Sequence, residues 1–159
     1  MNIREAKAQD CMSISRIYNR YLGKSTMDLE PKEASFYESF LIVKNAREEL
    51  WVAEIKNIII GWGVIKLYSP KLGYQYTGET SVYLDSDHLG LRYGTSIKQH
   101  LLNRCKALEY HNLLARIFAS NNVSIDYNKK LGYRIVGQQK EVGYINGHWQ
   151  DVVIMELIL

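Results

Sequence analysis

One stretch of this chain, residues 76–110, restricts the possible folds more than any other. It begins with an alternating, β-branched segment typical of a strand, 80–84. A polar, glycine-containing turn, 85–94, follows, and apolar residues then recur at helical spacing up to Leu108. The first turn of a helix has unpaired N–H groups and a positive dipole end, and glycine lets the backbone come close to an anion. The stretch therefore predicts a strand, a loop and a helix that hold a cofactor pyrophosphate.

The rest of the chain alternates strand and helix patterns around this stretch. Turn signals at 56–57 and 146–147 each join two strand patterns and predict antiparallel hairpins. The order β-α-α-β-β-β-α-β-α-β-β predicts a mixed sheet with helices on both faces, within a single domain over 1–159. The predicted strands cover 2–6, 50–55, 58–68, 80–84, 113–118, 133–144 and 149–157, and the predicted helices cover 10–22, 31–46, the stretch up to Leu108 and a short segment ending near Leu131.

Charge and composition exclude several classes of partner. The net charge is +3 and the Lys and Arg residues are scattered, whereas nucleic-acid binding needs them clustered. The longest apolar run, 58–65, is too short to span a bilayer, and the N-terminus lacks an apolar signal core, so we expect a cytoplasmic protein without a membrane partner. The two cysteines and four histidines show no metal-ligand spacing, so no metal site is predicted.

Four short patterns occur in a fixed order along the chain. They are Ile17–Tyr21 with Ser25-Thr26 and Glu30-Pro31; Tyr74–Tyr83; Asn121 and Ser124 with Lys130–Tyr133; and Val142–Gly147 with Trp149 and Asp151–Val153. Together they resemble the GNAT superfamily of N-acetyltransferases, and more narrowly its phosphinothricin and methionine sulfoximine acetyltransferase-like branch. The resemblance covers almost the whole chain, and four patterns in order are far more specific than one.

The resemblance implies a fold and a reaction. The fold is α/β (α+β), with a GNAT-type mixed, mostly antiparallel sheet of about seven strands flanked by four helices. The reaction moves an acetyl group from acetyl-CoA to the primary amine of a small amino-acid-like acceptor by direct attack in a ternary complex. In related enzymes the central strand carries a bulge and splays from the next strand, and the pantetheine arm lies between them. Related proteins are often dimers, and we expect a homodimer that uses the hairpin 146–149.

The cofactor loop departs from the family pattern. The superfamily sequence (Q/R)-x-x-G-x-(G/A) falls on residues 89–94, where Leu89 replaces Gln or Arg and Arg92 replaces the first glycine. A phosphate-binding loop of the family's shape then requires Arg92 to adopt a positive φ. Asn128 stands where the family often has a Tyr or His near the cofactor sulfur, and an amide is a poor proton donor. The residues that the resemblance assigns to the cofactor are Val82, Tyr83, Leu84, Leu89, Gly90, Leu91, Arg92, Tyr93, Gly94, Thr95, Asn121, Ser124 and Asn128.

The chemistry requires a base, because the attacking amine must be neutral and an α-amine has a pKa of roughly 8. Glu79 on the central strand can remove the proton directly or through water. The competing interpretation is a solvated strand carboxylate, and the surrounding TGETSVY pattern favours the catalytic one. A backbone N–H near Val82 can stabilise the charge that develops on the thioester oxygen. Arg92, Lys98 and Arg104 are candidates to meet the nucleotide phosphates, but for Lys98 and Arg104 a place on the solvated face of the helix is the favoured interpretation.

The acceptor is less constrained than the cofactor. By the resemblance, Thr26, Lys71, Tyr74 and Tyr144 are acceptor-pocket positions, with Lys71 able to hold an anionic group. One alternative is an acyl-CoA-binding sensor or partner module with little turnover, which the altered loop and Asn128 would suit. A second alternative is an acetyltransferase for a protein N-terminus or an antibiotic amine. The pocket segments are not rich in Asp and Glu, which argues against a cationic antibiotic.

Overall fold

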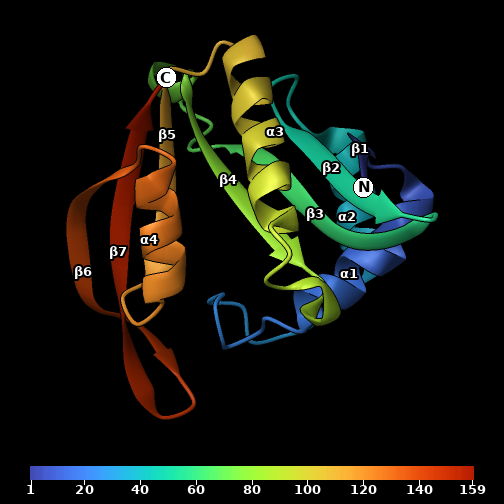
Figure 1. The fold of residues 1–159 in the computed structure, drawn as a ribbon. Helices are drawn as coiled ribbons and strands as arrows, with labels where there is room; N and C mark the ends of the chain where they lie inside the picture. The colour runs from blue at the N-terminus through green and yellow to red at the C-terminus, as the bar shows by residue number, and fades with distance from the viewer.

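The chain forms one seven-stranded sheet in the order β1-β2-β3-β4-β5-β7-β6 (Figure 1). The computed structural model describes residues 1–159. The strands are β1 (Asn2–Glu5), β2 (Glu49–Ile55), β3 (Ile58–Leu67), β4 (Thr77–Leu84), β5 (Asn112–Phe118), β6 (Arg134–Ile145) and β7 (His148–Ile158). The helices are α1 (Cys11–Asn19), α2 (Ala34–Val43), α3 (Tyr93–Ala107) and α4 (Asn122–Lys130). The predicted element order and the predicted fold class are confirmed.

Both predicted hairpins are present. Lys56 and Asn57 have φ of 50° and 64°, and Asn146 and Gly147 have φ of 49° and 83°. Two successive residues at positive φ match the right-handed twist of the strands that they join. All strand pairs are antiparallel except β4 with β5, which are parallel and are connected through α3.

Helices cover both faces of the sheet, with α3 and α4 on one face and α1 and α2 on the other (Figure 1). On the first face, Leu101 and Cys105 of α3 pack with Leu113 of β5 and Met155 of β7. On the second, apolar residues of α1 and α2 pack with β2 and β3 around Trp62. Burial of these two faces positions the strands between them.

Two predicted helices are longer than the observed ones. The chain enters α2 at Ala34 rather than at residue 31, because residue 32 is bound to α1: the Lys32 N–H donates to Asn19 Oδ1 at 2.9 Å, and the Ser15 hydroxyl donates to the Lys32 carbonyl at 2.6 Å. α1 ends at Asn19 instead of residue 22. α2 also ends three residues before the predicted position, at Val43.

The sheet opens between its two parallel strands. β4 pairs with β5 at three positions, from Thr77 to Glu79, and then the strands diverge. β5 stays paired with β7 up to Phe118, and β4 stays paired with β3 up to Leu84 without a shift in register. The divergence expected from the family resemblance is therefore present, but the bulge expected in β4 is absent from this pairing. None of the helices is long and apolar enough to span a lipid bilayer.

Candidate active site

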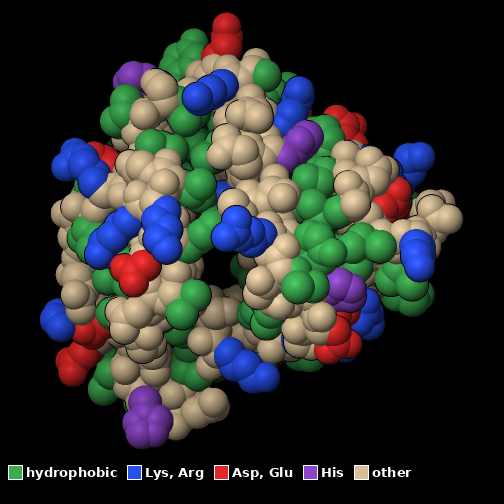
Figure 2. All heavy atoms as spheres, viewed as in Figure 1, with side chains coloured by type: hydrophobic (Ala, Val, Ile, Leu, Met, Phe, Trp, Pro, Cys, Tyr) green, Lys and Arg blue, Asp and Glu red, His purple; other side chains and the backbone are tan.

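A cavity of about 620 Å³ occupies the opening between β4 and β5. The molecular surface is hollowed between α3 and α4 at this level (Figure 2). The cavity is lined by β4 residues 79–83, by β5 residues 114–118, by α4 and by the loop after α1. Of the residues predicted to form the site, the cavity brings together Thr26, Glu79, Val82, Tyr83, Asn121, Ser124 and Asn128.

β4 presents different side chains to the two sides of this opening, because successive residues of a strand point to opposite faces. Tyr83 stacks on Trp62 with ring centroids 4.7 Å apart, on the face covered by α1 and α2. Leu84 packs with Ile97 of α3 on the other face. By the same alternation, Glu79 belongs to the α1 and α2 face, whereas Thr80 and Val82 belong to the α3 face.

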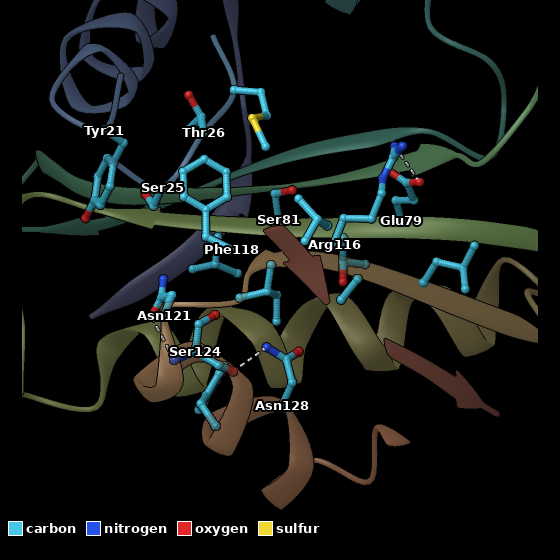
Figure 3. A pocket seen from close by; sticks show the side chains of 18 of the residues that line it. Tyr21, Ser25, Thr26, Glu79, Ser81, Arg116, Phe118, Asn121, Ser124 and Asn128 are labelled. Carbon is cyan, nitrogen blue, oxygen red and sulfur yellow. Dashed lines mark hydrogen bonds and ion pairs between the residues drawn. The ribbon is translucent and has the colours of Figure 1, made fainter. Parts of the chain in front are cut away.

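Glu79 is paired with Arg116 of β5, a residue outside the predicted site (Figure 3). Arg116 Nη2 donates to Glu79 Oε2 at 2.9 Å and lies 2.8 Å from Oε1 without hydrogen-bond geometry. Oε1 is thus buried and held by the ion pair alone, without a hydrogen bond. The available signal for Arg116 was a single charge inside the otherwise apolar strand pattern 113–118. Its partner could not be read from the sequence, because it depends on where β4 and β5 diverge.

The backbone of β4 offers a donor to the opening. The Thr77 carbonyl accepts from Tyr68, at the end of β3, and the Asp85 N–H donates to the Ile60 carbonyl of β3. Odd-numbered residues of β4 therefore direct their backbone groups toward β3. Val82 directs its N–H to the opposite edge, where β5 has already diverged. This is the position predicted for a donor to the thioester oxygen.

The loop before α3 has the form of an anion site. Arg92 adopts the left-handed conformation that the family's loop requires, with φ 63° and ψ 7°, and Gly90 has φ 79°. None of the six backbone N–H groups from Gly90 to Thr95 donates to a backbone carbonyl. Unpaired amides at the start of a 15-residue helix fit a diphosphate group. The Arg92 side chain is exposed, so it does not fill the loop.

The predicted loop residues do not line the cavity itself. The link between the two is Tyr127 of α4, which lines the cavity and donates its hydroxyl hydrogen to the Gly94 carbonyl at 3.2 Å. The loop and the cavity therefore form neighbouring parts of one surface. An elongated ligand held by its phosphates at the loop would reach into the opening between the strands.

The three predicted residues at α4, its N-cap Asn121 and the helical Ser124 and Asn128, have local partners (Figure 3). Asn121 Oδ1 accepts from the Ser124 N–H at 3.1 Å, which is an N-cap, and Asn128 Nδ2 donates to the Ser124 carbonyl at 2.8 Å. The Asn128 side-chain oxygen is buried in the cavity wall without a hydrogen-bond partner. Capping therefore accounts for Asn121, while the Asn128 oxygen has no structural partner.

Lys98 and Arg104 contradict the solvated-face prediction. Lys98 is only 4% exposed, lines the cavity, and donates from Nζ to Thr80 Oγ1 at 2.5 Å. Burial lowers the pKa of its ammonium group from 10.5 to about 8. Arg104 forms an ion pair with Glu49 at 2.6 Å. The prediction was wrong because helical spacing identified polar residues on α3 without showing what each one meets. Lys98 faces the opening that the diverging strands leave, and Arg104 faces Glu49 of β2.

The predicted acceptor residues are dispersed. Thr26 is buried in the cavity wall, in the loop that crosses the end of the opening. Lys71 and Tyr74 lie in the β3–β4 connection and do not line the cavity. Tyr144 is exposed on the β6–β7 hairpin, with its ring centroid 4.9 Å from that of Trp149. Within this one chain, the cavity walls therefore include Thr26 but not the other three.

Comparison with known proteins places this geometry in a family. Residues 3–154 match the model of the acetyltransferase (GNAT) domain. The chain is 30% identical to the L-methionine sulfoximine/L-methionine sulfone acetyltransferase of Pseudomonas paraeruginosa, over 99% of this chain and 94% of that protein. Among solved structures, the ribosomal-protein-alanine N-acetyltransferase of Brucella melitensis superposes with a TM-score of 0.95 at 26% identity, covering 100% of both chains.

A second solved structure carries the cofactor. The phosphinothricin acetyltransferase of Sinorhizobium meliloti, in complex with acetyl-CoA, superposes with a TM-score of 0.92 at 25% identity, over 99% of this chain and 88% of that one. The unpaired amides of the loop and the opening between β4 and β5 suit the same cofactor here. The chain belongs to the GNAT family and is an acetyl-CoA-dependent N-acetyltransferase.

Proposed function

We propose that this enzyme acetylates the primary amine of a small amino-acid-like acceptor of the phosphinothricin or methionine sulfoximine type. The observation that carries the proposal is the pair of opposite charges at the cavity, Glu79 and Arg116. A carboxylate beside a guanidinium is complementary to the ammonium and carboxylate groups of an amino acid. The acceptors named for the Pseudomonas and Sinorhizobium proteins are of this type.

Bound acetyl-CoA supplies an activated acetyl thioester. The amides of residues 90–95 hold its diphosphate, and the Val82 N–H donates to the oxygen that gains negative charge. The Glu79 carboxylate, which lines the cavity, accepts the amine proton. Cys11 and Cys105 are buried in the two helix-facing cores, and burial raises the pKa of each thiol, so neither is a suitable nucleophile for a covalent acetyl-enzyme.

Arg116 has a second role in this proposal. Its side chain is 58% exposed, so an acceptor carboxylate can bind its guanidinium while Oε2 of Glu79 stays in contact. A guanidinium has five donors and can serve two carboxylates at once. Binding of the acceptor would then place its amine nitrogen beside the Glu79 carboxylate.

The direct test is an acetyl-transfer assay with a set of amines. Release of the CoA thiol measures the rate with each amine. We expect turnover with L-methionine sulfoximine and phosphinothricin, and much lower turnover with an aminoglycoside. A peptide with an N-terminal alanine is included because of the Brucella structure. A strong preference for the peptide would replace the proposed acceptor with a protein N-terminus. Acetyl-CoA binding without turnover of any amine would instead favour a sensor module.

We also propose a homodimer formed through the β6–β7 hairpin. Trp149 is 62% exposed and Tyr144 is 57% exposed, so Trp149 does not close the core of its own chain. Exposed aromatic residues of this kind are common anchors of interfaces. Sedimentation of the wild type and of Trp149→Ser tests the proposal. We expect a dimer that the substitution weakens, and a monomeric wild type would contradict it.

A further inference from the structure

Lys98 is a buried cation without an anionic partner. Its Nζ donates to Thr80 Oγ1, lies 5.0 Å from the centroid of the Tyr133 ring, and is in no ion pair. An unpaired buried charge costs several kcal/mol. An apolar residue would fill this position on α3 at lower cost. Structural support therefore does not explain why a lysine stands here.

The groups around Lys98 leave hydrogen bonds unmade. An ammonium group has three donors, and Thr80 occupies one of them. The Asn128 Oδ1 atom, in the wall of the cavity, is also buried without a hydrogen-bond partner. The other titratable groups that face this region are Cys105 on α3, Tyr127 on α4, and the Glu79–Arg116 pair across the opening. Unsatisfied polar atoms in the wall of a cavity point to a ligand with polar atoms at this level.

The position of Lys98 relative to Glu79 matters for chemistry. Thr80, which holds Nζ, is the residue after Glu79 on β4, and its side chain points to the opposite face of the sheet. Glu79 and Lys98 therefore border the same opening from opposite faces. A thioester lying between the strands would have the carboxylate on the acceptor side and the ammonium group on the α3 side.

We propose that Lys98 is the general acid that protonates the sulfur of the departing coenzyme A. The inference rests on the acetyl transfer described above. The acceptor nitrogen forms a bond to the acetyl carbon, the carbon–sulfur bond breaks, and the sulfur takes a proton from Lys98 Nζ. Glu79 takes the proton that the amine loses. Exchange with solvent then returns the proton from Glu79 and restores the one on Lys98, so the residues end as they began.

Two independent features favour this role. Asn128, which lines the same wall, has an amide side chain that cannot act as a proton donor to a thiolate, so another donor is needed. Proton transfer is most efficient when the donor pKa lies near the working pH, and burial brings the pKa of Lys98 to about 8. A thiol has an ordinary pKa of about 8.5, which is close to that of the proposed donor.

The first test measures binding alone. Ultraviolet absorbance of the thiolate gives the pKa of the coenzyme A thiol when it is bound to the wild type and to Lys98→Met, and desulfo-coenzyme A provides the baseline. An ammonium group next to the sulfur stabilises the thiolate, so we expect a bound-thiol pKa below its free value in the wild type and a rise of about one unit or more in the variant. Equal bound-thiol pKa values in the wild type and the variant would overturn the proposal. A wild-type bound-thiol pKa equal to that of free coenzyme A would also overturn it.

The second test is kinetic. Lys98→Met should lower kcat roughly 10²-fold or more, with little change in the KM for acetyl-CoA, and should abolish the decline of kcat above about pH 8. Lys106→Met, at an exposed position of the same helix, is the matched control and should match the wild type. A rate sustained far above pH 8 in the wild type would assign the proton to a tyrosine such as Tyr127, whose pKa burial raises to about 12, and would overturn the role of Lys98. Wild-type turnover is measured separately, so a failure of the Lys98 proposal is distinguishable from a failure of the proposed acetyl transfer.

Discussion

The two charged groups that border the opening from β4 and α3 have opposite surroundings. Glu79, 24% exposed, faces the acceptor side and is neutralised by Arg116. Lys98 faces the α3 side, is buried, and has one hydroxyl as its hydrogen-bond partner. A carboxylate at the cavity can accept a proton, whereas a desolvated ammonium group releases one readily. The comparison shows how one opening in a sheet can hold a base and an acid without their neutralising each other.

The largest effect should come from removing the base. Glu79→Gln should lower kcat/KM roughly 10²–10⁴-fold, because the amide cannot take the proton from the amine. Steady-state kinetics between about pH 6 and pH 9 measure the loss. Glu109→Gln, which changes an exposed carboxylate whose ion pair to Arg47 is long, at 3.7 Å, is the control. If Glu79→Gln kept its rate across this range, the acceptor side of the comparison would have no catalytic base.

The pH dependence of the free energy of unfolding tests whether Lys98 is a buried, unpaired charge. The pKa of Lys98 is lower in the folded state, about 8, than its ordinary value of 10.5, so the unfolded chain binds more protons between these values. The free energy of unfolding of the wild type should therefore rise with pH through this window. Below about pH 8, Lys98→Met should be more stable than the wild type by ~3 kcal/mol, and the difference should vanish above about pH 10.5.

Urea unfolding at about pH 7 and about pH 10 measures this difference. Lys106→Met should change the free energy of unfolding by less than about 0.5 kcal/mol at both pH values. A Lys98→Met protein that is less stable than the wild type at neutral pH would show that the lysine has a structural partner. The contrast between the paired and the unpaired charge would then fail.

Substitution of Arg116 tests how the acceptor side of the opening binds its substrate. Arg116→Gln should raise the KM for an amino-acid acceptor roughly 10- to 100-fold, because a hydrogen bond to a charged group contributes about 1.5–3 kcal/mol. The KM for the same amine without its carboxylate should change much less. An equal effect on both acceptors would mean that Arg116 positions Glu79 and does not bind the acceptor carboxylate.

The smallest effect should come from Arg92, which lies outside the opening. Arg92→Gly relieves the left-handed conformation and should raise the free energy of unfolding by no more than about 1 kcal/mol. Affinity for acetyl-CoA should change by less than about tenfold, since the backbone amides hold the diphosphate. Thermal melting and calorimetric titration measure both quantities. A larger loss of affinity would show that the Arg92 charge, and not the loop backbone, binds the diphosphate.

Local signals in the sequence predicted much of this protein. The turns at 56–57 and 146–147, the end of the fourth helix near Leu131 and the strand before α3 all rest on residues close together in the chain. The resemblance predicted the sheet, the cofactor and the divergence of β4 from β5. Helix ends were less predictable, because side chains of α1 hold the backbone at Lys32 and delay the start of α2.

The amino-acid sequence by itself determined the order of elements, the loop with free amides and the place of Glu79 on its strand, because these depend on backbone propensity and short-range spacing. Only the tertiary structure decided that Arg116 meets Glu79 and that Lys98 is buried. Both depend on the line along which β4 and β5 diverge, which is set by long-range pairing and not by any local pattern. A charge at a given position in a chain becomes paired or desolvated according to the neighbours that the fold brings to it.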